Sequence, residues 1–165
     1  MKRQFLKLVV HVLILGCVYS CSEDETSYEI LIKHKTEKDY IEAINKSFAA
    51  IKKTEKKKNL ALEETDILRY EYALGESKDS FQITYRFDEK GCYEGGIDSY
   101  INEIIEANTV VTGFKTYFET NANFKNTETD NNLIRWESKD GLMVVELDYR
   151  NAEKGRIALT IFAYE

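Results

Sequence analysis

Imidazole and thiol side chains are scarce in this chain of 165 residues. It has two histidines, His11 and His34, and three cysteines, Cys17, Cys21 and Cys92. Ser–His–Asp and Cys–His catalysis needs an imidazole beside a nucleophile, yet His34 is the only histidine after residue 20 and no nucleophile motif surrounds it. The usual zinc sites of histidine and cysteine are excluded by the count of these residues. We therefore expect no catalytic site, no metal and no cofactor, and so no enzyme.

Phosphate loops, long apolar runs and an excess of cations are also absent. The glycine pair Gly95-Gly96 lacks the spacing of a dinucleotide-binding or P-loop motif. Apart from residues 8–15, the chain has no long apolar run of the kind that forms a transmembrane helix of about 20 residues. Removing residues 1–20 takes away three of the 23 basic residues and none of the 29 acidic ones, which leaves a net charge of −9. Such a chain is not expected to bind nucleic acid.

The N-terminal residues combine a positive start with a short apolar core. Lys2, Arg3 and Lys7 precede or flank the run Leu8–Leu15, which has the length of the apolar region in a secretory signal. Two tetrapeptides resemble a lipobox, Ile14-Leu15-Gly16-Cys17 and Val18-Tyr19-Ser20-Cys21. The second is followed by Ser22-Glu23-Asp24-Glu25, which resembles the serine-plus-acidic export signal of Bacteroidetes surface lipoproteins.

This resemblance implies a location. Residues 1–20 would be a signal peptide, Cys21 would carry lipid, and 21–35 would be an acidic tether to a bacterial outer membrane, with the protein facing the cell surface. Cleavage before Cys17 and ordinary secretion are the alternatives. If Cys21 is lipidated, Cys92 has no partner for an intramolecular disulfide, so it is either a small buried hydrophobe or a reactive thiol.

The chain resembles itself at two offsets. At an offset of 66, Leu68-Arg69-Tyr70-Glu71 aligns with Ile134-Arg135-Trp136-Glu137. At 64, Tyr85-Arg86 and the turn Glu89-Lys90-Gly91 align with Tyr149-Arg150 and Glu153-Lys154-Gly155. Such internal similarity predicts two copies of one structural unit.

Each copy has one helical stripe followed by alternating strands. Ile41, Ile44, Phe48 and Ile51 map onto Ala107, Val110, Phe114 and Tyr117 with the spacing of a buried helix face. Thr36-x-x-Asp39 resembles a capping box, and we expect that first helix to continue to Lys58. Residues 68–74, 81–87 and 145–149 alternate apolar and polar side chains, as strands with one dry face do.

The sequence thus predicts an α+β domain at 36–165 made of two α-β-β-β repeats, 36–101 and 102–165. Six strands or so would form one antiparallel sheet with two helices on one face. This tandem layout resembles that of the beta-lactamase inhibitory protein family. The resemblance is limited to the layout, because no sequence motif of that family is recognisable here.

The other face of this sheet would carry arginines and carboxylates from both repeats, and arginine is common where proteins recognise partners. We expect the protein to be a non-catalytic binding module for an unknown protein or glycan. The alternative is an envelope inhibitor or immunity-type protein with one cognate protein partner. The same residues are also explained by a solvent-exposed face with cross-strand ion pairs and no binding role. The candidate binding residues are Arg69, Glu71, Arg86, Arg135, Glu137, Arg150, Phe162 and Tyr164.

Overall fold

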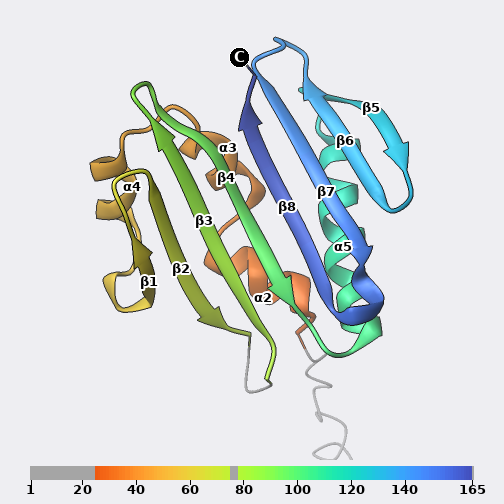
Figure 1. The fold of residues 1–165 in the computed structure, drawn as a ribbon. Helices are drawn as coiled ribbons and strands as arrows, with labels where there is room; N and C mark the ends of the chain where they lie inside the picture. Colours follow the sequence, from red (N-terminus) through yellow and green to blue (C-terminus); the bar gives the residue numbers. More distant parts are fainter. Residues whose placement is uncertain (1–24, 75–77, 165) are drawn as a thin grey trace, which may run out of the picture.

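The computed structural model describes residues 25–74 and 78–164 (Figure 1). Three short helices come first, and a longer one separates two groups of four strands. The helices are α2 (Ser27–His34), α3 (Glu37–Ala43), α4 (Phe48–Thr54) and α5 (Ile104–Thr120). The strands are β1 (Leu60–Glu63), β2 (Ile67–Ala73), β3 (Ser80–Asp88), β4 (Gly91–Tyr100), β5 (Phe124–Asp130), β6 (Leu133–Ser138), β7 (Met143–Asn151) and β8 (Arg156–Ala163). Two 3-10 turns, η1 (Lys57–Asn59) and η2 (Ala152–Lys154), complete the described elements.

The strands form one open antiparallel sheet in the order β1-β2-β3-β4-β8-β7-β6-β5. The α+β class and the single antiparallel sheet are confirmed, but the sheet has eight strands where about six were predicted. The two that the sequence pattern missed, β1 and β5, are the two edges. An edge strand needs no dry face of its own, and β5 buries only its first residue, Phe124.

All four helices lie on one side of the sheet in Figure 1, and the core fills the space between. Strand side chains alternate into it as predicted: Phe81, Ile83 and Tyr85 are at most 1% exposed. Trp136 of β6 is also fully buried, and its ring packs against that of Phe118 in α5. The expected number of helices was wrong, because the described residues contain three short helices where one was predicted before the first strand.

The predicted helix from Thr36 to Lys58 is broken in the middle. The capping box is present, since the Thr36 side chain accepts from the Asp39 amide and the Asp39 carboxylate accepts from the Thr36 amide. After Ala43 the chain turns at Asn45, whose φ is +67°. The Asn45 amide donates to the Cys92 carbonyl at 2.8 Å, and the Cys92 amide donates to the Lys46 carbonyl at 2.9 Å. These bonds to β4 replace the helical ones, while the apolar stripe still faces the core.

Helix α2 lies within residues 21–35, which we expected to be a tether. Thr26 and Glu29 form a capping box at its start, and Leu31 is 1% exposed. Tyr28 packs edge-on against Phe114 of α5, where a Cβ at Gly113 would lie 2.4 Å from the Tyr28 ring. The folded region therefore begins about ten residues earlier than predicted.

The strand order reads the same from either edge, with β2 and β6, β3 and β7, and β4 and β8 in equivalent places. This order agrees with the predicted duplication, which stays a prediction. The pairing of the strands changes one of the residue matches between the two predicted repeats. Leu68 pairs with Tyr85, whereas Ile134 pairs with Leu147, so Tyr85 corresponds to Leu147 and not to Tyr149.

Candidate binding site

The face of the sheet opposite the helices is covered by none of the described elements (Figure 1). Its centre is made of small side chains on β4 and β8, where Gly96 pairs with Thr160 and Asp98 pairs with Ala158. A Cβ at Gly96 would lie 2.6 Å from the Leu159 carbonyl oxygen, so the two strands approach too closely there for a larger residue. Larger side chains of the same two strands, such as Asp98 and Arg156, lie beyond this close approach.

Most arginines on this face are held by carboxylates. The Arg86 and Arg156 guanidinium groups lie 3.1 and 2.9 Å from the carboxylates of Glu94 and Asp98. The pKa of Arg135 is raised by its hydrogen bond to Glu146, and that of Asp148 is lowered by its bond from Arg150. Exposed pairs of this kind contribute about 0–1 kcal/mol each to stability. Their effect is to fix where the side chains point. The pairs are Arg86–Glu94, Arg135–Glu128, Arg135–Glu146, Arg150–Asp148 and Arg156–Asp98.

Three predicted residues lack such a pair within the part of the chain that the structure describes. Arg69 donates only to the Thr84 hydroxyl, at 3.4 Å. Glu71 and Glu137 take part in no ion pair among those residues, and Glu71 is exposed. Arginine and carboxylate side chains lie on both halves of the sheet, but the two halves are paired differently.

A shallow hollow of about 400 Å³ lies at one end of this face. Phe162 pairs across the sheet with Val144, and Tyr164 is 60% exposed beyond the end of β8. The Tyr164 amide donates to the Leu142 carbonyl at 2.7 Å, which holds the last described residue against the β6–β7 turn. The lining residues are Arg135, Glu137, Val144, Glu146, Phe162, Ala163 and Tyr164, so four of the eight predicted residues meet here.

The other four predicted residues lie elsewhere. Arg69, Glu71 and Arg86 stand on β2 and β3, in the other half of the sheet. Arg150 lies on β7, towards its far end, beside its partner Asp148. The hollow therefore brings together residues at the β6–β7–β8 end of the predicted face and leaves these four outside it.

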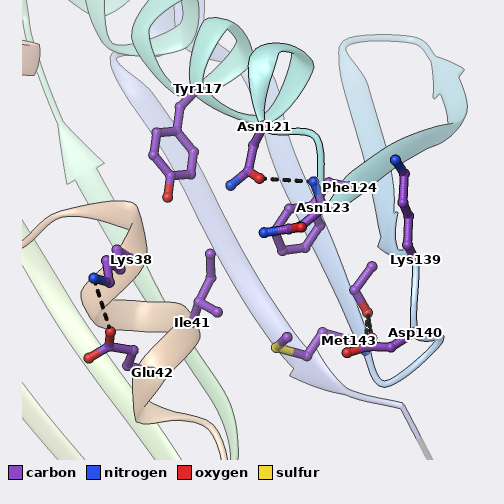
Figure 2. A pocket seen from close by; sticks show the side chains of 11 residues that line it. Lys38, Ile41, Glu42, Tyr117, Asn121, Asn123, Phe124, Lys139, Asp140 and Met143 are labelled. Atoms are coloured by element: carbon purple, nitrogen blue, oxygen red, sulfur yellow. Dashed lines mark hydrogen bonds and ion pairs between the residues drawn. The ribbon is translucent and has the colours of Figure 1, made fainter.

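The helix side of the same β6–β7 hairpin holds a cleft of about 450 Å³, which the sequence did not reveal (Figure 2). It comes from three separate segments, so only the tertiary fold brings it together. The lining residues are Lys38, Ile41 and Glu42 of α3, Tyr117, Asn121, Asn123 and Phe124 around the end of α5, and Ser138, Lys139, Asp140 and Met143 of the hairpin.

The charged groups of this cleft are largely satisfied. Lys38 pairs with Glu42 at 3.5 Å. The Asp140 carboxylate accepts from the Ser138 hydroxyl at 2.6 Å, and this bond lowers the pKa of Asp140. Figure 2 shows the Tyr117 hydroxyl and the Asn121 amide turned towards the space above Ile41 and Met143. The cleft thus offers neutral hydrogen-bonding groups over an apolar floor.

A third polar cluster is buried beneath β2 and β3. The Glu55 carboxylate, 5% exposed, forms an ion pair with Lys35 and accepts hydrogen bonds from the hydroxyls of Tyr85 at 2.8 Å and Tyr72 at 3.3 Å. Burial, followed by the nearby Glu55, raises the pKa of Tyr70 to about 12 and that of Tyr85 well above its ordinary value. The cluster lines neither hollow, so we assign it to stability.

Cys92 and His34, the one cysteine and the one histidine within residues 25–74 and 78–164, lie away from both hollows. Cys92 is fully buried, its Sγ donates to the Glu94 carbonyl at 3.3 Å, and burial raises its pKa to about 12. The His34 ring lies tilted against Tyr72 and edge-on to Phe81, and burial lowers its pKa. No group of three or more possible metal ligands occurs among residues 25–74 and 78–164.

The predicted lipid attachment at Cys21 and the export residues Ser22, Glu23 and Asp24 lie outside the described residues. Glu25, the last residue of that signal, is described and forms an ion pair with Lys33 of α2. None of the helices in the described ranges is long and apolar enough to span a bilayer.

Comparison with known proteins adds no relative: the chain matches no protein-family model, no curated protein and no solved structure.

Proposed function

We propose that this protein is a lipid-anchored, non-catalytic binding module on the surface of a bacterial outer membrane. The observation that carries the proposal is the uncovered face of the eight-stranded sheet, with a hollow at one end lined by Arg135, Phe162 and Tyr164. The anchor rests on the lipobox ending at Cys21 and the acidic residues after it.

The chemistry of the hollow favours recognition of a partner. Aromatic residues and arginine are enriched in interface cores and account for most binding hot spots. Here the Arg135 guanidinium is already held by Glu128 and Glu146. A side chain fixed before binding loses less conformational entropy when the partner arrives. Val144 and Phe162 supply apolar area beside it.

Photocrosslinking in intact cells tests this function. A photoreactive amino acid at Glu137, which lines the hollow, is compared with one at Thr116, which is exposed on α5. We expect adducts at position 137 that disappear with Phe162→Ala, and none at 116. Equal adducts at the two positions, or adducts that Phe162→Ala leaves unchanged, would contradict binding at this face.

The same experiment separates the second candidate function, an inhibitor or immunity-type protein. The breadth of the open face, with ion pairs on strands β3 to β8, favours it, because a protein interface of standard size buries about 800 Å² on each partner. One adduct of a single protein mass would support this alternative. Adducts with glycan or with several surface molecules would support a general binding module.

Mass spectrometry of the mature N-terminus tests the anchor. We expect a lipid-modified Cys21 as the first residue, lost in Cys21→Ser and kept in Cys17→Ser. A lipidated Cys17, or an unmodified chain, would contradict it.

A further inference from the structure

The starts of α2 and α5 lie at the end of the molecule away from the β6–β7 turn (Figure 1). Exposed apolar side chains at this end form an apolar patch. Ile104 and Ile105 form the first turn of α5 and are 54% and 75% exposed. Tyr100, at the end of β4 just before them, is 41% exposed at the same end of the molecule but on the open face of the sheet, where it pairs with Arg156. A groove of about 600 Å³ extends from Ile105 between α5 and α2, where Ile32 also lines it. Two consecutive exposed isoleucines beside this groove leave apolar surface in water, and its removal from water would be favourable.

The start of the described chain is tied to this patch. The Ser27 amide, in the first turn of α2, donates to the Glu106 carboxylate of α5 at 2.7 Å. The Thr26 cap that precedes it also lines the groove. The beginning of α2 is therefore held within one hydrogen bond of the helix turn that carries Ile104 and Ile105.

The distance to the proposed lipid is short. Cys21 lies four residue positions before Glu25, the first described residue. A fully extended chain spans at most about 3.6 Å per residue, so the lipidated cysteine would lie within about 14 Å of Glu25. An acyl anchor on such a short connection keeps this end of the domain at the bilayer surface.

We infer that Tyr100, Ile104 and Ile105 contact the lipid bilayer and fix the orientation of the anchored domain. This inference rests on the proposed lipid anchor. Tyrosine suits the boundary between headgroups and acyl chains, because its ring is buried there while its hydroxyl stays hydrated. Isoleucine is wholly apolar and suits the acyl side of that boundary. No lysine or arginine lines the groove. Insertion is therefore driven by apolar contact and does not require anionic lipid.

Fluorescence quenching in vesicles tests the inference with protein expressed from the complete sequence and processed by its host. A bimane label is attached at Asn108→Cys, one helical turn after Ile105 and lining the same groove, or at Leu142→Cys at the opposite end. Cys92 is fully buried and does not compete for the label. The protein is reconstituted into phosphatidylcholine vesicles with brominated acyl chains, and each variant is checked for folding by circular dichroism.

We expect quenching and a blue shift at position 108, neither at 142, and loss of both at 108 in Ile104→Ser/Ile105→Ser. Equal quenching at 108 and 142 in protein whose Cys21 carries lipid would overturn this inference and leave the anchor standing. Unchanged quenching in the double serine variant would also overturn it. Mass spectrometry of the same sample reads the anchor separately, because an unmodified Cys21 overturns the proposed function and this orientation with it.

Discussion

The buried Glu55 cluster gives the sharpest test of what holds the helices to the sheet. Glu55 follows α4, Lys35 follows α2, and Tyr72 and Tyr85 come from β2 and β3. One carboxylate thus connects two helix ends to two strands. Replacing it removes the charge that balances Lys35 and the acceptor that satisfies the Tyr85 hydroxyl. We predict that Glu55→Ala is among the most destabilising single substitutions outside the apolar core.

The magnitude follows from the groups left behind. Tyr85 is fully buried, and a buried hydroxyl without a partner costs about 1–3 kcal/mol. The Lys35 side chain is 16% exposed, so its loss of a counter-ion costs less than the about 3–5 kcal/mol typical of a fully buried pair. Together we expect Glu55→Ala to lower the free energy of unfolding by about 3–5 kcal/mol. Glu55→Gln keeps an acceptor for Tyr85 and should lose about 1–2 kcal/mol less.

Urea unfolding of the mature protein, followed by the fluorescence of Trp136, measures these losses. Trp136 is the only tryptophan and is fully buried, so its emission reports the core. The midpoint should fall while the dependence on urea concentration stays constant. In Glu55→Ala/Lys35→Met the loss should be smaller than the sum of the single losses, because the orphaned ammonium is gone. A loss below about 1 kcal/mol for Glu55→Ala, as for a surface ion pair, would refute the reasoning.

Three further predictions concern backbone strain, the buried thiol and alkaline pH. Gly155→Ala should destabilise the protein more than Gly141→Ala in urea unfolding: both glycines have positive φ, but only at Gly155 would a Cβ also clash, 2.3 Å from a carbonyl oxygen. Cys92 should not react with a thiol reagent at pH 8 until the protein is unfolded in urea, and rapid reaction in the native state would support the reactive-thiol reading instead. Because burial raises the pKa of Tyr85, the unfolded state loses this proton first, so stability should fall as pH rises above about 10. The free energy of unfolding is measured by urea titration at several pH values between 9 and 11. In Tyr85→Phe its fall with pH should be less steep by the slope that corresponds to about one proton, and an unchanged slope would argue against this prediction.

The sequence pattern predicted the inner strands well because their environment is two-sided. Strands such as β3 pack one face on the helices and leave the other open, which produces a clean alternation over Phe81–Phe87. The edge strand β5 has solvent on nearly all its side chains, so Lys125 to Asp130 show no apolar period to detect. The missed strands are therefore those for which burial imposes least on the sequence.

The helix errors have a different origin. Thr26-x-x-Glu29 is as good a capping box as Thr36-x-x-Asp39, and its pattern was available in the sequence before α2. The break after Ala43 was not, because it depends on backbone hydrogen bonds with Cys92, nearly fifty residues away in the chain: the Asn45 amide donates to the Cys92 carbonyl and the Cys92 amide donates to the Lys46 carbonyl. For the same reason the Figure 2 cleft, built from three distant segments, could not be predicted.

The positions of the exposed large hydrophobic side chains relate the proposed anchor to the proposed binding face. Among the described residues, Tyr100, Ile104 and Ile105 lie at one end of the sheet, and Tyr93, Leu142 and Tyr164 lie at the other. The cross-strand register fixes this division, since Glu94 pairs with Phe162 while Tyr100 pairs with Arg156. The seven residue steps from Tyr93 to Tyr100 span about 23 Å along β4. If the first group rests on the membrane, the hollow beside Tyr164 projects away from it by about that distance. The orientation that buries one set of apolar side chains is then the orientation that presents the other to a partner.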